Sequence, residues 1–383
     1  MERTRWSLVL LVFAGGLLAA AQFGKVALTL DATAAAFGRP ATDVAFLVSL
    51  VGGVGLVLGA MAGGVAAAFG PGRTFLVGLL LGGMLSLLQA LLPSFGLFAV
   101  TRAVEGLAHL ALVVGGPPLM AAAASDRDRS LVMGLWAVFF GASLGVSAQV
   151  FPWILAAGGL PLLLGLHGAA LLALAIPLWS RVPRVAMAPM PLDPVAVHRE
   201  IYGGIRYMAP GLGFVCYTFL FVAGVAILPG ALGRPELATS LPLVTLTTTL
   251  VGGALCRRFP PHRVVAMGYA GTGAGALAIA LNLPLGAEFC FAAMGVVPGA
   301  SFAAIAAWNV GPRDRARATG AIAQLGNLGT VTGTPVFAFV AARAGAAGLV
   351  WLIAGAALLG LVLALGAGRR AAGAQKSEML PVR

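Results

Sequence analysis

The chain has 383 residues, of which 60% are hydrophobic and only 9% are charged, and its mean hydropathy is +0.99. Soluble domains contain about 45–50% apolar residues, so this composition excludes a folded soluble protein. The formal net charge of +12 must then be explained by where the basic residues lie relative to a membrane. We therefore expect an all-α integral membrane protein.

Apolar stretches of about 18–25 residues, each long enough to cross a bilayer as a helix, recur along the whole chain. We predict about twelve transmembrane helices, six on each side of one polar, proline-bearing segment. The spans are expected near residues 7–29, 45–68, 74–93, 96–122, 130–156, 160–179, 208–231, 238–256, 264–284, 288–309, 318–341 and 346–367. The expected parts are an N-terminal six-helix bundle (1–180), a cytoplasmic linker (181–207), a C-terminal six-helix bundle (208–370) and a cytoplasmic tail (371–383).

The basic residues are concentrated in the segments that are expected to lie on one side of the membrane. If the N-terminus is cytoplasmic, most of the 24 Lys and Arg residues fall in inner-side segments, as the positive-inside rule requires. An even number of spans returns the C-terminus to the same side, so we expect a multi-pass protein of the cytoplasmic (inner) membrane with both termini cytoplasmic. Basic residues spread over many short loops form no nucleic-acid surface, so no nucleic-acid partner is expected.

Two pairs of segments indicate an internal duplication. The stretches "GGVAAAFGPGRTFLVG" and "GALCRRFPPHRVVAMG" share Gly, Phe, Pro, Arg and Gly at matching positions. The stretches "SDRDRSLVMG" and "GPRDRARATG" place an Arg-Asp-Arg cluster before an apolar run in each half. Two six-span halves related by a parallel repeat are the plan of secondary transporters that rock two bundles around a central site.

One motif in the fourth span links the chain to a known family. The stretch "RAVEGLA", residues 102–108, has Arg, two variable residues, Glu and Gly, and with it the chain resembles the major facilitator superfamily over essentially its whole length. The loop "GGVAAAFGPGR" resembles the family's signature between spans two and three, although Ala67 and Ala68 stand where the family has an acidic residue. In "GASLGVSAQ" of span five, Val146 stands where family antiporters carry a proline.

This resemblance implies two pseudo-symmetric six-helix bundles and a secondary active transporter that works by alternating access. The missing proline in span five favours proton-coupled uptake, or symport, of a small organic solute. The alternative is a proton-coupled efflux antiporter for drugs or metabolites. A channel or receptor is a third class, which saturable, gradient-dependent flux would exclude.

Ionisable groups inside spans mark the expected site, because each costs about 2.5–3.5 kcal/mol to insert unless it is paired or wetted. Arg102, Glu105 and His109 are spaced i, i+3 and i+7, so they share one face of span four and are predicted to face the cavity. Arg102 and Glu105 form either a structural ion pair or a site in which Arg102 modulates the proton affinity of Glu105 or binds an anionic substrate group. Gln22 and Lys25 share a face of span one, where Lys25 either lines the path or snorkels to the surface.

Amides in apolar spans are further candidates for substrate binding or coupling, because they are unfavourable in lipid. They either line the path or link helices. The candidates are Gln149, Gln324 and Asn327.

The Arg-Asp-Arg clusters have two interpretations. Asp128 and Asp314 cap the fifth span of each half by accepting hydrogen bonds from free backbone amides. Alternatively, Asp126, Asp128 and Asp314 pair with Arg73 or Arg263 across the two halves and close a cytoplasmic gate.

The motifs of other protein classes are missing from the sequence. It contains no metal-spaced His/Cys set, no nucleotide-binding loop and no nucleophile with a base at matching spacing, so we expect no enzyme activity, metal or cofactor. The expected partners are a small-molecule substrate, membrane lipid and protons, and the protein is expected to be a monomer. The substrate is expected to be a compact organic solute, either an anion or a flat vitamin-like heterocycle.

Overall fold

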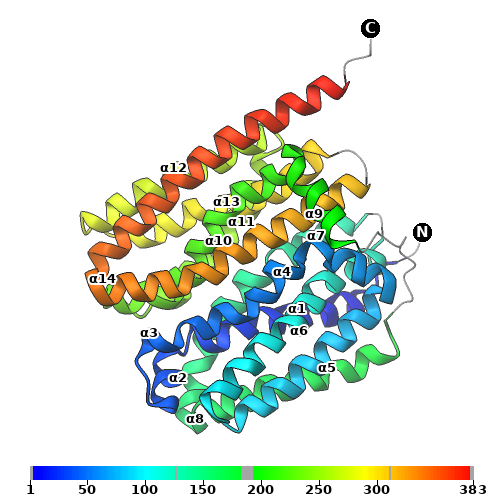
Figure 1. Ribbon diagram of the computed structural model, residues 1–383. Coiled ribbons are helices and arrows are strands. Elements are labelled where there is room, and N and C mark those ends of the chain that lie inside the picture. The colour runs from blue at the N-terminus through cyan, green and yellow to red at the C-terminus, as the bar shows by residue number, and fades with distance from the viewer. Residues whose placement is uncertain (1–2, 126, 183–192, 310–311, 380–383) are drawn as a thin grey trace. The chain divides into compact units, whose positions relative to one another are not determined.

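The computed structural model describes residues 3–125, 127–182, 193–309 and 312–379. Within these ranges every regular element is a helix (Figure 1). The helices are α1 (Trp6–Ala27), α2 (Leu30–Phe37), α3 (Ala41–Val44), α4 (Phe46–Phe69), α5 (Pro71–Ala90), α6 (Phe95–Ala123), α7 (Arg129–Ala137), α8 (Phe139–Trp179), α9 (Pro194–Gly203), α10 (Ile205–Ala231), α11 (Leu237–Leu255), α12 (Pro261–Ala280), α13 (Gly286–Trp308) and α14 (Pro312–Met379).

The twelve predicted spans are present in the described part of the chain. Nine of its helices are long and apolar enough to cross a membrane. Two of these, α8 and α14, each contain two spans, because Gly158 and Gly159 in α8 and Gly345 in α14 leave the helical conformation. The 20-residue helix α12 supplies the remaining span. The protein is therefore an all-α integral membrane protein of two six-helix bundles.

The helices divide into two compact units. The first comprises Met1–Gly55 and Ala62–Leu192, and the second comprises Leu56–Met61 and Asp193–Arg383. In the first unit, α5 packs against α6 and α8, and α1 packs against α6 and α8. In the second, α10 packs along α14, and α13 packs against α11 and α12.

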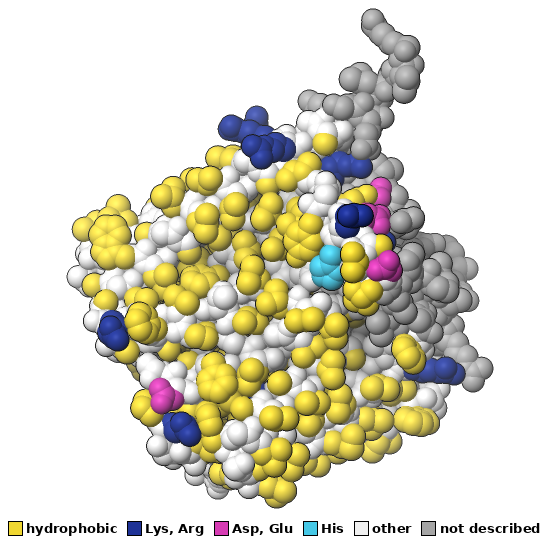
Figure 2. Space-filling view, viewed as in Figure 1, with side chains coloured by type: hydrophobic (Ala, Val, Ile, Leu, Met, Phe, Trp, Pro, Cys, Tyr) yellow, Lys and Arg dark blue, Asp and Glu magenta, His cyan; other side chains and the backbone are white. Residues whose placement is uncertain are grey.

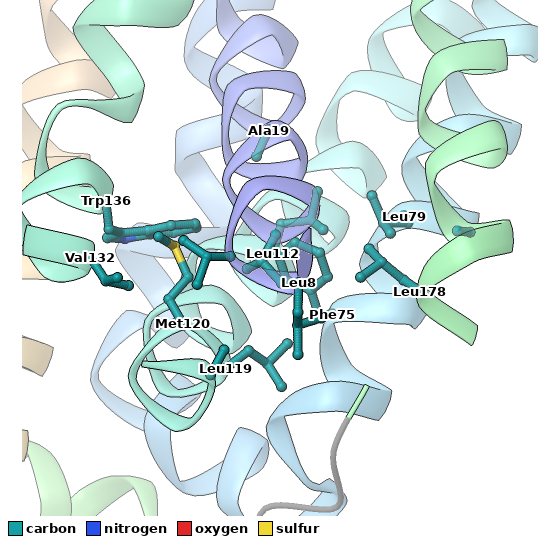
Figure 3. Packing of buried hydrophobic residues seen from close by; sticks show 14 of the residues in the cluster. Leu8, Ala19, Phe75, Leu79, Leu112, Leu119, Met120, Val132, Trp136 and Leu178 are labelled. Atoms are coloured by element: carbon teal, nitrogen blue, oxygen red, sulfur yellow. The ribbon is translucent and has the colours of Figure 1, made fainter. Parts of the chain in front are cut away.

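The core of the first unit is built from apolar side chains of five helices (Figure 3). Leu8 of α1, Phe75 of α5 and Leu112 of α6 are buried against one another, and Leu178 of α8 joins the same cluster. Trp136 of α7 is 7% exposed and belongs to this cluster. This packing fixes α1, α5, α6 and α8, which carry the polar residues described below.

Many large apolar side chains remain exposed, including Val57, Trp153 and Trp351 at 65%, 79% and 78%. In Figure 2 hydrophobic side chains cover most of the visible face, and the coloured charged side chains lie towards its margins. Such a surface is unfavourable in water but matches the hydrocarbon of a bilayer. The apolar surface is therefore the lipid-facing surface.

Three segments differ from the predicted boundaries. Part of the expected linker forms α9, because Asp193 accepts hydrogen bonds from the amides of Val195 (2.9 Å) and Ala196 (3.2 Å) and a proline occupies the first helical position. The predicted fifth span is interrupted at Val138, where α7 ends and α8 begins. The last helix, α14, continues into the expected tail as far as Met379.

Candidate functional site

Three ionisable side chains meet inside the first unit. Lys25 of α1 and Arg102 and Glu105 of α6 are each 0% exposed. Lys25 Nζ lies 2.7 Å from Glu105 Oε1, and Arg102 Nη1 lies 2.5 Å from Glu105 Oε2. Each carboxylate oxygen therefore faces one cation. Because charged groups are buried only when they are paired, Lys25 and Arg102 are what allows Glu105 to be ionised here.

Helix α5 completes the cluster with two polar side chains one turn apart. Lys25 Nζ donates to Ser86 Oγ (2.8 Å) and to Gln89 Oε1 (2.7 Å), so the ammonium group makes two hydrogen bonds beside its ion pair with Glu105. Gln89 Nε2 donates to Glu105 Oε2 (3.0 Å). Ser86 and Gln89 were not among the residues predicted from the sequence. Their spacing of i and i+3 in an apolar helix was a signal that could have identified them.

The glycine of the "RAVEGLA" motif explains how α6 approaches α4. A Cβ at Gly106 would lie 2.5 Å from the carbonyl oxygen of Val51, so only glycine allows this contact. On the neighbouring turn, Arg102 Nε donates to the carbonyl oxygen of Leu47 (3.2 Å). The motif therefore serves both the close packing of two helices and the orientation of the guanidinium group.

Two side chains beside the cluster keep free hydrogen-bonding capacity. Gln22 of α1 is 0% exposed, and neither atom of its amide has a hydrogen-bond partner among the described residues. Its Nε2 packs against α5, where a Cβ at Gly82 would lie 2.7 Å away. Arg102 Nη2 likewise has no partner among the described residues. These are buried donors that no group in the described chain satisfies.

Two histidines border the same region. His109 Nδ1 lies 2.9 Å from the carbonyl oxygen of Ala19, and its ring meets Phe23 edge-on at 4.9 Å. His167 of α8 was not among the predicted residues; its Nε2 lies 3.0 Å from the carbonyl oxygen of Leu18, and its Nδ1 lies 3.1 Å from Ser86 Oγ. Because a carbonyl oxygen only accepts hydrogen bonds, the nitrogen that faces it carries a proton in both rings.

The structure corrects one interpretation of Lys25. Snorkelling to the surface is wrong, because its ammonium group is held inside the unit by partners from α5 and α6 that lie far away in the sequence. The i, i+3, i+7 face of span four is present as expected. It brings Glu105 against α1 and α5 within the first unit.

Two of the three predicted amides, Gln324 and Asn327, make their hydrogen bonds away from this cluster. Gln149 of α8 is exposed. Gln324 Oε1 accepts from the hydroxyl of Tyr202 (3.2 Å), and its Nε2 lies 3.0 Å from His198 Nε2, so Gln324 links α14 to α9. Asn327 Nδ2 donates to the carbonyl oxygen of Ala323 (2.8 Å) within α14.

The two described aspartates of the Arg-Asp-Arg clusters bind hydroxyl groups. Asp128 accepts from Thr4 Oγ1 (2.5 Å) and Ser125 Oγ (3.2 Å) and makes no side-chain hydrogen bond to the start of α7. The capping interpretation is therefore wrong for Asp128, because these hydroxyl groups occupy its carboxylate. Asp314 Oδ1 accepts from the hydroxyl of Tyr207 (2.9 Å).

The remaining gate candidates are Arg73, Arg263 and Asp126. Arg73 and Arg263 are exposed in the first turns of α5 and α12. Asp126 lies outside the described residues. Pairing across the two halves stays a prediction.

Comparison with known proteins rests on structure alone. No family model matches the sequence, and no curated protein matches it. A bacterial homolog of the human lysosomal transporter Spinster, in an inward-facing and unoccupied conformation, is similar with a TM-score of 0.72 and 16% identity over 100% of both chains. The xylose transporter XylE from E. coli gives a TM-score of 0.74 at 16% identity, covering 94% of this chain and 96% of its own.

The human organic anion transporter MFSD10 (TETRAN) gives a TM-score of 0.67 at 18% identity, covering 93% of this chain and 98% of its own. This chain has the major facilitator fold. Within the major facilitator fold, the ion cluster belongs to the first half and joins its first, third and fourth spans, with the sixth span beside it at His167.

Proposed function

We propose that the protein is a secondary active transporter of the cytoplasmic membrane, with both termini cytoplasmic, that takes up a small organic anion together with protons. The observation that carries the proposal is the buried cluster of Lys25, Glu105 and Arg102 inside a twelve-span major facilitator fold. Buried ionisable groups are unfavourable in hydrocarbon and mark substrate and proton paths. The similar solved structures, named as transporters, support the same class.

Glu105 is the proposed coupling group. A proton-driven carrier needs a carboxyl group that binds a proton on one side of the membrane and releases it on the other. In the described state each oxygen of Glu105 faces a cation, so the group is unloaded. Once Oε1 has taken a proton, a movement of α1 that withdraws Lys25 keeps the carboxyl group neutral, and the return of Lys25 expels the proton.

The charge of the cluster argues for an anionic substrate. It holds two cations and one carboxylate, so one positive charge is in excess. Arg102 Nη2 and the amide of Gln22 are buried donors without partners among the described residues. An anion compensates the excess charge and also accepts hydrogen bonds from these donors. A neutral solute can accept the hydrogen bonds but leaves the charge uncompensated. The three side chains are 0% exposed, so the anion is admitted only when α1, α5 or α6 moves.

The proposed direction is uptake, driven by protons that enter together with the anion. A proton that enters with an anion neutralises it, so an inward proton gradient drives accumulation without moving net charge. Val146 stands in span five where antiporters of the family that the sequence resembles carry a proline, which favours uptake. The antiporter alternative predicts accumulation when the inside of the liposome is acid, whereas uptake with protons predicts accumulation when the outside is acid.

Transport by purified protein in liposomes tests the proposal. Radiolabelled gluconate, succinate and nicotinate serve as anions and xylose as the neutral comparison, and protein-free liposomes subtract passive entry. With acid outside, we expect at least one anion to accumulate and a protonophore to abolish the accumulation. Accumulation with acid inside would instead establish an antiporter, and no gradient-driven flux in either direction would contradict the proposal.

A further inference from the structure

An ion pair followed by two hydrogen bonds joins Glu105 to His167. Glu105 Oε1 and Lys25 Nζ are 2.7 Å apart, Lys25 Nζ and Ser86 Oγ 2.8 Å, and Ser86 Oγ and His167 Nδ1 3.1 Å. The four residues come from α6, α1, α5 and α8. Every step lies within hydrogen-bonding distance, so the chain is connected from end to end without water.

His167 is the only one of these four with an exposed edge. It is 7% exposed, whereas Glu105, Lys25 and Ser86 are 0% exposed. The charged groups that reach its Nδ1 side through Ser86 are Lys25 from α1 and the Glu105–Arg102 pair from α6. Of the four, His167 is therefore the residue with surface left to meet a proton from outside the cluster.

The hydroxyl of Ser86 accommodates both protonation states of His167. Its oxygen lies 3.1 Å from His167 Nδ1 and 2.9 Å from the carbonyl oxygen of Leu164, so its single hydrogen has two acceptors. When His167 is neutral, with its proton on Nε2, Ser86 donates to Nδ1. When Nδ1 is also protonated, it donates to Ser86 Oγ, and the serine hydrogen turns to Leu164. No heavy atom has to move.

We propose that His167 is the proton-entry group of the buried cluster and that Ser86 and Lys25 pass the proton on to Glu105. This inference rests on the proposed function and assigns the route to its coupling group. In the transfer, a Lys25 Nζ–H bond breaks and an Oε1–H bond forms on Glu105. The neutral amine then turns its lone pair towards Ser86, the Ser86 hydrogen turns away from Leu164 and moves to Nζ, and the Nδ1 hydrogen of His167 moves to Ser86 Oγ.

The transfer is balanced and needs no other reactant. His167 ends neutral, Ser86 ends as a hydroxyl and Lys25 ends as an ammonium ion, while Glu105 becomes a neutral acid. One proton has crossed from the edge of the unit to its centre. The neutral carboxyl no longer compensates either cation, so the cluster becomes more attractive to an anion in the same step.

The test separates proton delivery from substrate binding. The probe is whichever of gluconate, succinate and nicotinate the parent protein accumulates most strongly. Two assays use the same liposomes: accumulation driven by a pH gradient, and exchange of internal for external probe at equal pH, which needs no net proton transfer. Ser86→Ala removes the middle of the chain, and Ser86→Thr is the control that keeps a hydroxyl group.

We expect Ser86→Ala to lower the initial rate of accumulation about tenfold or more, as loss of a proton-transfer group does, while exchange stays within about twofold of the parent. Ser86→Thr should restore most of the accumulation. His167→Gln, which keeps an amide in reach of Leu18 but carries no exchangeable charge, should reproduce the Ser86→Ala result independently.

Parent-like accumulation in Ser86→Ala or in His167→Gln would overturn the route while leaving the proposed function intact. Equal loss of accumulation and exchange in these variants would also overturn it, because the residues would then serve packing or binding. A parent protein without any gradient-driven accumulation would overturn both the route and the proposed function.

Discussion

The two units satisfy their buried polar groups in different ways. In the first unit, side chains of separate helices bond to one another, with Lys25 joined to Glu105, Ser86 and Gln89. Among the described residues of the second unit, no ion pair has two fully buried members, and its buried hydroxyl groups, like Thr29 and Ser86 of the first unit, bond to helix carbonyls. Thr249 Oγ1, for example, donates to the carbonyl oxygens of Thr245 (2.8 Å) and Gly295 (3.1 Å).

The ion pair that the second unit buries most deeply among its described residues is also of another kind. Arg317 Nη2 lies 2.7 Å from Glu200 Oε2, but the glutamate is 29% exposed and the pair ties α14 to α9. Hydroxyl-to-carbonyl bonds carry no net charge and gain no proton. The fold therefore has two similar bundles, whereas among the described residues the ion pairs with two fully buried members lie in the first.

The largest expected effect comes from leaving the cations of the first unit without their carboxylate. Glu105→Leu should lower the free energy of unfolding by about 3–5 kcal/mol, the typical result of removing one partner of a buried ion pair. Thr249→Val in the second unit, which removes one neutral hydroxyl, should cost about 1 kcal/mol. Thermal unfolding in detergent compares the two, and equal shifts would erase the distinction between the units.

A smaller effect tests how the second unit is packed. A Cβ at Gly329 would overlap Thr218 and the backbone of Val215, so α10 and α14 have to separate to admit it. Gly329→Ala should therefore cost about 1–3 kcal/mol. Gly273→Ala is the matched control, because a Cβ there meets no atom within 4 Å, and its melting temperature should not fall. Similar melting temperatures for the two variants would argue against the close contact.

The smallest effect is expected at a surface ion pair of the second unit. Arg234 Nε lies 2.8 Å from Glu236 Oε1 in the turn before α11, with exposed fractions of 38% and 60%. The hydrogen bond from Arg234 holds the pKa of the Glu236 carboxyl below its usual value, so its contribution is present near neutral pH and lost as the pH falls through that lowered pKa. Solvent screens such pairs, so the melting temperature of Glu236→Gln should match that of the parent. A clear drop that high salt removes would show that the pair matters.

The sequence was sufficient to predict the membrane-spanning helices and the positions of most of the breaks between them. Span length and hydropathy depend on each segment alone, which is why the six-plus-six arrangement could be predicted. The helix α9 was missed because hydropathy sees only a polar segment, although Asp193 followed by Pro194 is a helix start signal. The split at Val138 has no comparable signal in the apolar run around it.

The candidate site was predictable only in part. Arg102 and Glu105 could be placed on one face because their spacing lies within one helix. Lys25 was open to a wrong interpretation, since a lysine near the end of a span snorkels when it has no buried partner, and that partner lies 80 residues away at Glu105. His167 was missed for the same reason, because its hydrogen bond to Ser86 depends on how two helices pack.

The most direct measurement is pH-gradient-driven accumulation by Glu105→Gln in liposomes, with exchange of the same anion at equal pH as the internal control. Glutamine keeps the size of the side chain and an oxygen for Lys25 or Arg102, but it cannot bind or release a proton. We predict that accumulation is abolished while exchange is retained, and that Arg102→Ala weakens both. If Glu105→Gln still concentrates the anion as the parent does, Glu105 is a structural partner of the two cations, and the proton-coupling site lies elsewhere.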